Sequence, residues 1–198
     1  MTDLLFDSPG NPLPGNAAAD TFTTRDGKRI RYALFGATER PLRGTVILLQ
    51  GRNECIEKYF ETIRDLQKAG LGVATFDWRG QGGSQRLLRN PRRGHVRRFA
   101  HYVTDLEQFY QDIVLPDCRL PLFVLAHSTG ALIALLAAPV PELMPFLVLR
   151  CLDWARPVRD RARAGLATLL ADRPDFVTAV LPTALRTANR YRGRFAVT

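Results

Sequence analysis

Three short, largely apolar runs constrain the fold of this chain more than any other feature. They span residues 45–49, 71–76 and 122–125, and turn residues or charged residues bound them. Such runs, without alternation, are typical of strands that are buried on both faces of a sheet. Stretches with apolar residues at helical spacing, at 56–66 and 99–113, lie between the runs. The alternation predicts an α/β fold with a mostly parallel sheet and helices on both faces.

The N-terminal part is predicted to be an arm followed by a hairpin. Residues 1–20 are polar and rich in Pro and Gly, which predicts a flexible arm. Two short strands are expected at 21–24 and 29–35. The pair Asp26-Gly27 between them is a strong hairpin turn signal.

The C-terminal part differs in composition from the rest. The predicted α/β core spans residues 21–139, and a divergent Arg-rich tail spans 140–198. Between Arg150 and Thr198 there are ten Arg, no Lys and four Asp. Helical stretches are predicted at about 157–171 and 175–189, together with one strand at 146–149. No further strand is predicted in the tail.

A strand, a sharp turn and an apolar helix surround one serine. Ala126-His127-Ser128-Thr129-Gly130 directly follows the third apolar run and precedes the apolar helix predicted at 131–138. A nucleophile elbow needs small residues two before and two after the serine, because the turn brings them close together. Ser128 is therefore the candidate nucleophile. The alternative is a serine that caps the N-terminus of a buried helix.

Two backbone N–H groups are candidates for an oxyanion hole. Thr129 lies at the start of the helix after Ser128, where N–H groups have no intrahelical partner. The second donor should come from the loop after the strand at 45–49, where Gly51 permits close approach of a ligand to the backbone. The N–H of Arg52 is the candidate there. A plain strand-to-helix turn is the alternative.

Four segments together carry a family resemblance. They are residues 50–54 (QGRNE), 77–84 (DWRGQGGS), 94–99 (GHVRRF) and 125–130 (LAHSTG). The chain resembles the lysophospholipase and monoacylglycerol-lipase branch of the α/β-hydrolase superfamily. The resemblance implies hydrolysis of a carboxylic ester in a lipid-like or small acyl substrate, without a metal or organic cofactor. It also implies Ser128 as nucleophile, with Arg52 and Thr129 as oxyanion donors.

The histidines depart from the pattern of this superfamily. The order along the chain should be Ser, acid, His, yet His95, His101 and His127 all precede Ser128. His127 is expected to pack behind the elbow and not to act in catalysis. Because no histidine follows Ser128, the triad base stays unassigned, and so does the acid. One interpretation is a reading frame that is truncated or frameshifted after about Ala138. The alternative function is a catalytically incomplete remnant that binds a ligand or partner.

Composition and charge limit the partners and the location. Three cysteines without CxxC spacing favour reduced thiols in the cytoplasm over disulfides or a zinc site. The net charge is +9, and a basic loop at Arg86–Arg98 could meet anionic lipid at the inner membrane. No nucleic-acid-binding module is recognised in the Arg-rich tail, so no nucleic acid is expected. A sheet that stops after five or six strands predicts self-association through an exposed edge.

Overall fold

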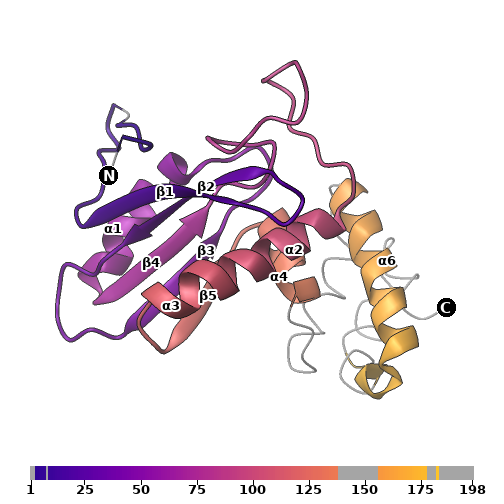
Figure 1. Cartoon of the computed structure of the whole chain (residues 1–198). Coiled ribbons are helices and arrows are strands. Elements are labelled where there is room, and N and C mark those ends of the chain that lie inside the picture. The colour runs from indigo at the N-terminus through magenta and orange to yellow at the C-terminus, as the bar shows by residue number, and fades with distance from the viewer. Residues whose placement is uncertain (1–2, 8, 138–155, 178–181, 183–198) are drawn as a thin grey trace. The chain divides into compact units, whose positions relative to one another are not determined.

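The computed structural model describes residues 3–7, 9–137, 156–177 and 182 (Figure 1). The chain divides into two compact units, Met1–Ala131 and Leu132–Thr198. The first unit contains the whole sheet that the described residues form, and it holds all four segments that carry the family resemblance.

A five-stranded mixed sheet with the order β1-β2-β4-β3-β5 organises the first unit. The strands β3, β4 and β5 are parallel, and the hairpin of β1 and β2 joins β4 in antiparallel fashion. The fold is that of an α/β protein, as predicted. The strands are β1 (Ala17–Thr23), β2 (Arg29–Phe35), β3 (Gly44–Leu49), β4 (Leu71–Phe76) and β5 (Leu122–Ala126).

The hairpin lies where the turn signal predicted it. Gly27 has φ +76 and donates its N–H to Thr24 O at 2.8 Å. Strand β1 begins at Ala17, four residues before the predicted start, so it takes up the end of the predicted arm. Leu5 within that arm is buried in the core, because it packs with residues on one face of the sheet.

Helix α1 (Phe60–Lys68) covers one face of the sheet (Figure 1). The short 3-10 turn η1 (Ile56–Tyr59) leads into it. Phe60 and Ile63 are fully buried and pack with Phe35 of β2, and the ring centroids of Phe35 and Phe60 are 6.2 Å apart. The apolar spacing that predicted a helix at 56–66 therefore corresponds to the face that meets the sheet.

Helix α2 (Ala100–Phe109) packs on the opposite face. Its Phe109 ring lies 4.7 Å from Phe76 and 6.2 Å from both Phe22 and Tyr32, centroid to centroid. The helical path continues through a π-helical segment at Tyr110–Val114 and ends in α3 (Leu115–Asp117). Helices therefore cover both faces of the sheet, as predicted.

Strand β5 differs from the expectation of a fully buried strand. Among the described residues it pairs only with β3, so it forms an edge of the sheet. Phe123, Val124 and Leu125 are 47%, 59% and 43% exposed. An apolar run indicates a strand but does not show whether a neighbour covers it, and this accounts for the wrong assignment of burial.

The second unit is described only in part. Helix α4 (Thr129–Ala137) crosses from the first unit into the second, and α6 (Arg156–Asp172) confirms the helix predicted at 157–171. A 3-10 turn follows at Pro174–Phe176. The strand predicted at 146–149 and most of the helix predicted at 175–189 lie outside the described residues.

Candidate active site

Ser128 occupies the sharp turn between β5 and α4. Its φ is +50, a left-handed conformation that a residue with a side chain seldom adopts. Such strain of about 1–3 kcal/mol persists only where neighbouring contacts hold the backbone. Two hydrogen bonds of 2.9 Å do so here: His127 N donates to Leu49 O, and Gly130 N donates to His127 O. The turn is therefore tied to the end of β3.

Gly130 lets the turn approach β3 closely. A Cβ atom at this position would lie 2.6 Å from the carbonyl oxygens of both Leu49 and Gln50. Backbone atoms cannot move away as a flexible side chain can, so only glycine fits. The requirement for a small residue two positions after Ser128 thus has a direct steric cause.

The loop after β3 lies beside this turn, because His127 N donates to Leu49 O at the end of β3. Gly51 N donates to Glu54 Oε2 at 2.7 Å, and Asn53 N donates to Gln81 Oε1 at 2.5 Å. Between them, Arg52 N has no acceptor within the described residues. Asn53 has φ +62, which turns the chain back toward η1. The backbone of Arg52 is thus available to a ligand.

Thr129 is the first residue of α4 and is buried. An N–H group in the first turn of a helix has no intrahelical acceptor, and the helix dipole adds partial positive charge there. The two predicted donors thus come from different elements, Thr129 from the start of α4 and Arg52 from the loop after β3.

Asp77, at the end of β4, organises the floor of the site. It is completely buried, and its two oxygens accept hydrogen bonds from Ile56 N at 3.0 Å and Gly83 N at 2.6 Å. Arg31 Nε donates to Asp77 Oδ2 at 2.7 Å. Burial raises the pKa of Asp77, while Arg31 and the N–H of Gly83 act in the opposite direction. Asp77 is an acceptor that fixes loops, and it is not free for catalysis.

Arg79 anchors the same segment to α2. Its guanidinium group donates to Asp105 at 2.5 and 2.6 Å and to Asp26 at 2.8 and 3.0 Å. Arg79 and Asp105 are both buried. The Asp-x-Arg-Gly motif is therefore a structural element that holds the Gly-rich loop: Asp77 pairs with Arg31, and Arg79 pairs with Asp26 and Asp105.

His127 lies in a different place from the one predicted. Its side chain is 63% exposed and is not packed behind the elbow. Its Nδ1 lies 3.2 Å from Glu54 Oε2 and 3.4 Å from the hydroxyl of Tyr59. The turn places the residue before Ser128 outward, so the imidazole meets the loop after β3.

The other two histidines lie away from the elbow. His95 is exposed in the loop after β4, and His101 is half-buried on α2. Within the part of the chain that the structure describes, no histidine forms a hydrogen bond with Ser128. The triad acid and base stay unassigned.

Sequence reasoning missed Glu54, which joins the two loops of the site. Its carboxylate also accepts hydrogen bonds from Lys58 and, at 2.5 Å, from the Tyr59 hydroxyl. The partner His127 lies 73 residues further along the chain. The only signal was Glu54 itself within the QGRNE segment, and nothing in its spacing pointed to His127.

Comparison with known families decides the classification. Residues 40–148 match the model of the hydrolase family described as serine aminopeptidase S33. The chain belongs to this family. Lysophospholipase L2 of Escherichia coli K12 is 41% identical over 115 residues, which cover 58% of this chain and 33% of the relative. The probable lysophospholipase L2 of Haemophilus influenzae is 38% identical over 111 residues, 54% of this chain and 35% of the relative.

Solved structures agree on the fold. A thermostable carboxyl esterase from Bacillus coagulans superposes with a TM-score of 0.50 at 24% identity, covering 60% of this chain and 38% of the esterase. The α/β hydrolase GrgF from Penicillium gives 0.50 at 22% identity, covering 61% of this chain and 40% of the other. The chain therefore has the fold of an α/β hydrolase, and it spans about a third of the length of its curated relatives.

Two kinds of feature are absent from the part of the chain that the structure describes. No group of three metal-binding side chains comes together there. Within the same residues, no helix combines the length and the apolar composition that a membrane crossing requires.

Proposed function

We propose that this chain carries the nucleophile of a serine hydrolase that cleaves carboxylic esters of lipid-like substrates through an acyl-enzyme at Ser128. The left-handed backbone of Ser128, between β5 and α4, carries this proposal. It is the conformation that lifts a serine side chain away from the turn of a nucleophile elbow.

The residues support the following steps. Ser128 Oγ attacks the ester carbonyl carbon, and the N–H groups of Arg52 and Thr129 bind the oxyanion that forms. Collapse of this intermediate breaks the ester C–O bond, releases the alcohol and leaves the acyl group on Ser128. Water then hydrolyses the acyl-enzyme. A general base takes the serine proton and gives it to the departing alcohol oxygen; it then takes a proton from the attacking water and returns it to Ser128 Oγ as the carboxylic acid leaves. No residue assigned in this chain supplies this base.

The substrate class rests on the relatives. Besides the two lysophospholipases, the monoacylglycerol lipase of Mycolicibacterium smegmatis is 31% identical over 110 residues, 56% of this chain and 37% of that protein. The names of these proteins all refer to a substrate that is a glycerol-based lipid with a single acyl chain. An ester of this kind is the substrate proposed for this chain.

Labelling with a fluorophosphonate probe tests the nucleophile. The probe reacts with an activated serine and needs no choice of substrate. We expect the native chain to label, and Ser128→Ala and the heat-denatured native chain not to label. Labelling that persists in Ser128→Ala would refute the role of this residue.

The alternative is a non-catalytic chain that binds an acyl ligand or a partner. The observation that favours it is the lack of a histidine partner for Ser128 within the described residues. A serine without a base is a poor nucleophile near neutral pH. Failure of both the native chain and Ser128→Ala to label, with the fold intact by circular dichroism, would favour this alternative.

Three further parts of the proposal concern location and partners. The cysteines favour a cytoplasmic chain, which cell fractionation tests.

Peripheral contact of loop 86–98 with anionic lipid rests on its six exposed arginines, and salt-sensitive flotation with phosphatidylglycerol vesicles tests it. Self-association of two copies rests on the exposed β5, because an apolar edge strand is a template for pairing with another chain.

A further inference from the structure

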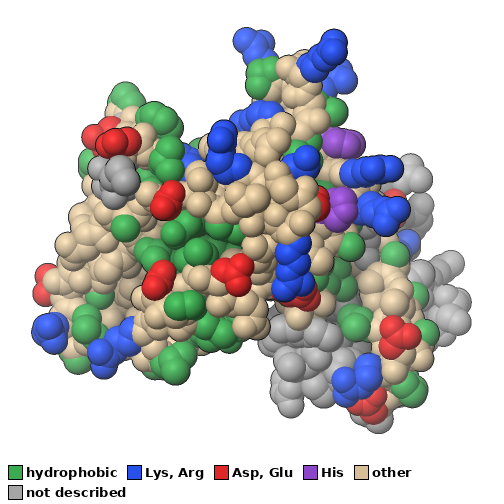
Figure 2. Space-filling view, in the orientation of Figure 1, with side chains coloured by type: hydrophobic (Ala, Val, Ile, Leu, Met, Phe, Trp, Pro, Cys, Tyr) green, Lys and Arg blue, Asp and Glu red, His purple; other side chains and the backbone are tan. Residues whose placement is uncertain are grey.

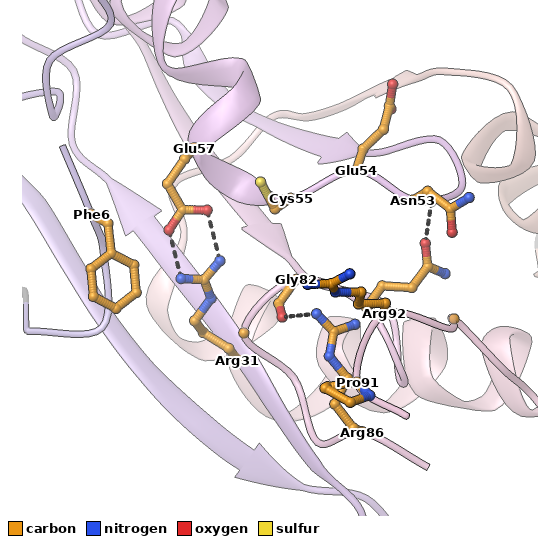
Figure 3. A pocket seen from close by; sticks show the side chains of 13 residues that line it. Phe6, Arg31, Asn53, Glu54, Cys55, Glu57, Gly82, Arg86, Pro91 and Arg92 are labelled. Atoms are coloured by element: carbon orange, nitrogen blue, oxygen red, sulfur yellow. Dashed lines mark hydrogen bonds and ion pairs between the residues drawn. The ribbon is translucent and has the colours of Figure 1, made fainter. Parts of the chain in front are cut away.

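A cavity of about 450 Å³ lies next to the candidate active site (Figure 3). The loop after β3 forms one wall with Asn53, Glu54 and Cys55. The loop after β4 forms the opposite wall, and Arg86 and Arg92 project from it. The remaining lining comes from Phe6, Arg31, Glu57, Gln81, Gly82, Gly83, Pro91 and Gly94.

The carboxylates of this cavity already have cationic partners. Glu57 accepts hydrogen bonds from Arg31 at 2.6 and 2.8 Å, as the dashed lines of Figure 3 show. Glu54 is paired with Lys58. Arg31 is shared with the buried Asp77, which does not line the cavity, so each carboxylate of the lining has a cationic partner and at most one negative charge stays uncompensated.

The arginines of the opposite wall have no such compensation. Arg86 donates to two neutral carbonyl oxygens, Gly80 O at 2.6 Å and Gly82 O at 2.8 Å. These bonds hold its guanidinium group in place and leave its positive charge unpaired. Arg92 forms no ion pair within the described residues. Two positive charges thus face one cavity, and hydrogen bonds hold that of Arg86 in place.

The sequence around the cavity increases this positive potential. No Asp or Glu occurs between Asp77 and Asp105. Figure 2 shows Lys and Arg side chains along the projecting loop at the top of the view. A concave surface lined by one sign of charge concentrates ligands of the opposite sign. The other exposed arginines of this loop are Arg89, Arg93, Arg97 and Arg98.

We propose that this cavity binds a phosphate group through the guanidinium groups of Arg86 and Arg92. A guanidinium group presents a planar fork of N–H donors that matches two phosphate oxygens. The side-chain amide of Asn53, which has no hydrogen-bond partner among the described residues, supplies a further donor on the facing wall. The volume also accommodates the glycerol part of a phosphate ester.

The phosphate can come from a free phosphate ester or from a lysophospholipid head group. Asn53 and Glu54 line the cavity and directly follow Arg52, the proposed oxyanion donor, in the chain. The cavity thus shares a wall with the ester site, which favours the lipid head group. The binding itself does not depend on the proposed hydrolase activity.

Calorimetric titration of the full chain tests the site. Glycerol 3-phosphate is titrated into Ser128→Ala, in which ester cleavage cannot occur, and into the same chain with Arg92→Gln. Arg92→Gln removes a charge-assisted hydrogen bond worth roughly 1.5–3 kcal/mol, so the variant should bind glycerol 3-phosphate at least about tenfold more weakly. Arg93→Gln is the matched control, because Arg93 is an exposed neighbour that does not line the cavity. An equal loss in Arg93→Gln, or no loss in Arg92→Gln, overturns the proposal.

Cys55 provides a second readout within the same cavity. Burial raises the pKa of its thiol, so alkylation with iodoacetamide is measured at alkaline pH by peptide mass spectrometry. Glycerol 3-phosphate should slow alkylation of Cys55 severalfold and leave Cys118, which does not line the cavity, unchanged. Unchanged alkylation of Cys55 at a saturating concentration also overturns the proposal.

The source of the phosphate is resolved by ligand choice. A lysophosphatidic acid below its critical micelle concentration is compared with inorganic phosphate, glycerol 3-phosphate and a monoacylglycerol of the same chain length. Tighter binding of the lysophosphatidic acid that Arg92→Gln abolishes identifies a lipid head group. Equal binding of lysophosphatidic acid and glycerol 3-phosphate identifies a free phosphate ester. Equal binding of lysophosphatidic acid and monoacylglycerol contradicts phosphate recognition. Since none of these measurements requires ester cleavage, their failure is distinct from failure of Ser128 to label.

Discussion

Glu54 Oε2 lies 3.2 Å from Nδ1 of His127, and this contact joins the loop after β3 to the turn after β5. The same oxygen accepts the N–H of Gly51 at 2.7 Å. Glu54 thus holds together the loop after β3 and the turn after β5. It is a positioning residue for the two proposed oxyanion donors.

The first prediction concerns the acid stability that Glu54 provides. Burial opposes its ionisation, but hydrogen bonds from Lys58, Tyr59, His127 and Gly51 N–H outweigh this and lower the pKa of Glu54 to about 2. A carboxyl whose pKa is lower in the folded state stabilises the fold above its unfolded pKa. This stability is lost as the pH falls from about 4.3 toward the folded pKa.

We therefore expect Glu54→Gln to lower the free energy of unfolding at pH 7 by roughly 1 kcal/mol, since solvent screens a surface network of this kind. As the pH falls from about 4.3 to about 2, the free energy of unfolding of this variant should decrease less than that of the native chain. Urea denaturation across this pH range measures both effects. Glu61→Gln, on the exposed face of α1, is the control and should change stability by less than about 0.5 kcal/mol. Equal pH profiles for the native chain and Glu54→Gln would contradict the assignment.

The second prediction concerns the close approach at Gly130. In Gly130→Ala the new Cβ would lie 2.6 Å from two backbone oxygens of β3 and the following residue, so the turn must shift. We expect a destabilisation of about 1–3 kcal/mol, as for other overpacked sites, and loss of fluorophosphonate labelling. Gly15→Ala is the control, because a Cβ at Gly15 has no atom within 4 Å. Normal labelling of a stable Gly130→Ala would show that the turn tolerates the shift.

How far the sequence predicted the structure depends on the range of the interactions. The strands β3 and β4 and the helices α1 and α2 follow from local apolar spacing, which the chain displays directly. The Ser128 turn was likewise predictable, because a turn this tight requires small residues at 126 and 130, and the sequence has them there. The exposure of β5 was not, because it depends on whether a neighbouring strand covers Val124.

Contacts between distant residues set the remaining limit. The pairing of Glu54 with His127, and that of Arg31 with Glu57, arise from loops that the sheet brings together. No periodicity marks either pair in the sequence. The cavity between Asn53 and Arg92 belongs to the same class, since its walls come from two loops that follow different strands.

The third prediction concerns the buried ion pair of Arg79 and Asp105. The side chain of Arg79 is only 2% exposed. Asp105→Ala leaves it with one acidic partner, Asp26, which is itself partly exposed. Removing one member of a buried pair typically costs about 3–5 kcal/mol. The double variant Arg79→Met with Asp105→Leu removes both charges and should be clearly more stable than Asp105→Ala. Thermal unfolding by circular dichroism compares the two, and equal melting temperatures would mean that the pair is not coupled.

The fourth prediction concerns the exposed edge of the sheet. Val124 is 59% exposed on β5, between Phe123 and Leu125, which are also exposed. Two copies of such a strand can pair through their free backbone groups and bury these side chains. We expect the native chain to show a concentration-dependent increase in mass by analytical ultracentrifugation. A lysine on an edge strand opposes pairing, so Val124→Lys should shift the chain toward monomer.

Leu120→Lys makes the matched comparison for this edge. Leu120 is 69% exposed and lies just before β5, so the substitution makes the same change of charge and apolar area outside the strand. If only Val124→Lys dissociates the chain, association occurs along β5. If both variants dissociate it equally, the effect is one of net charge. A native chain that stays monomeric at high concentration, with a cooperative melt, would exclude pairing through this edge.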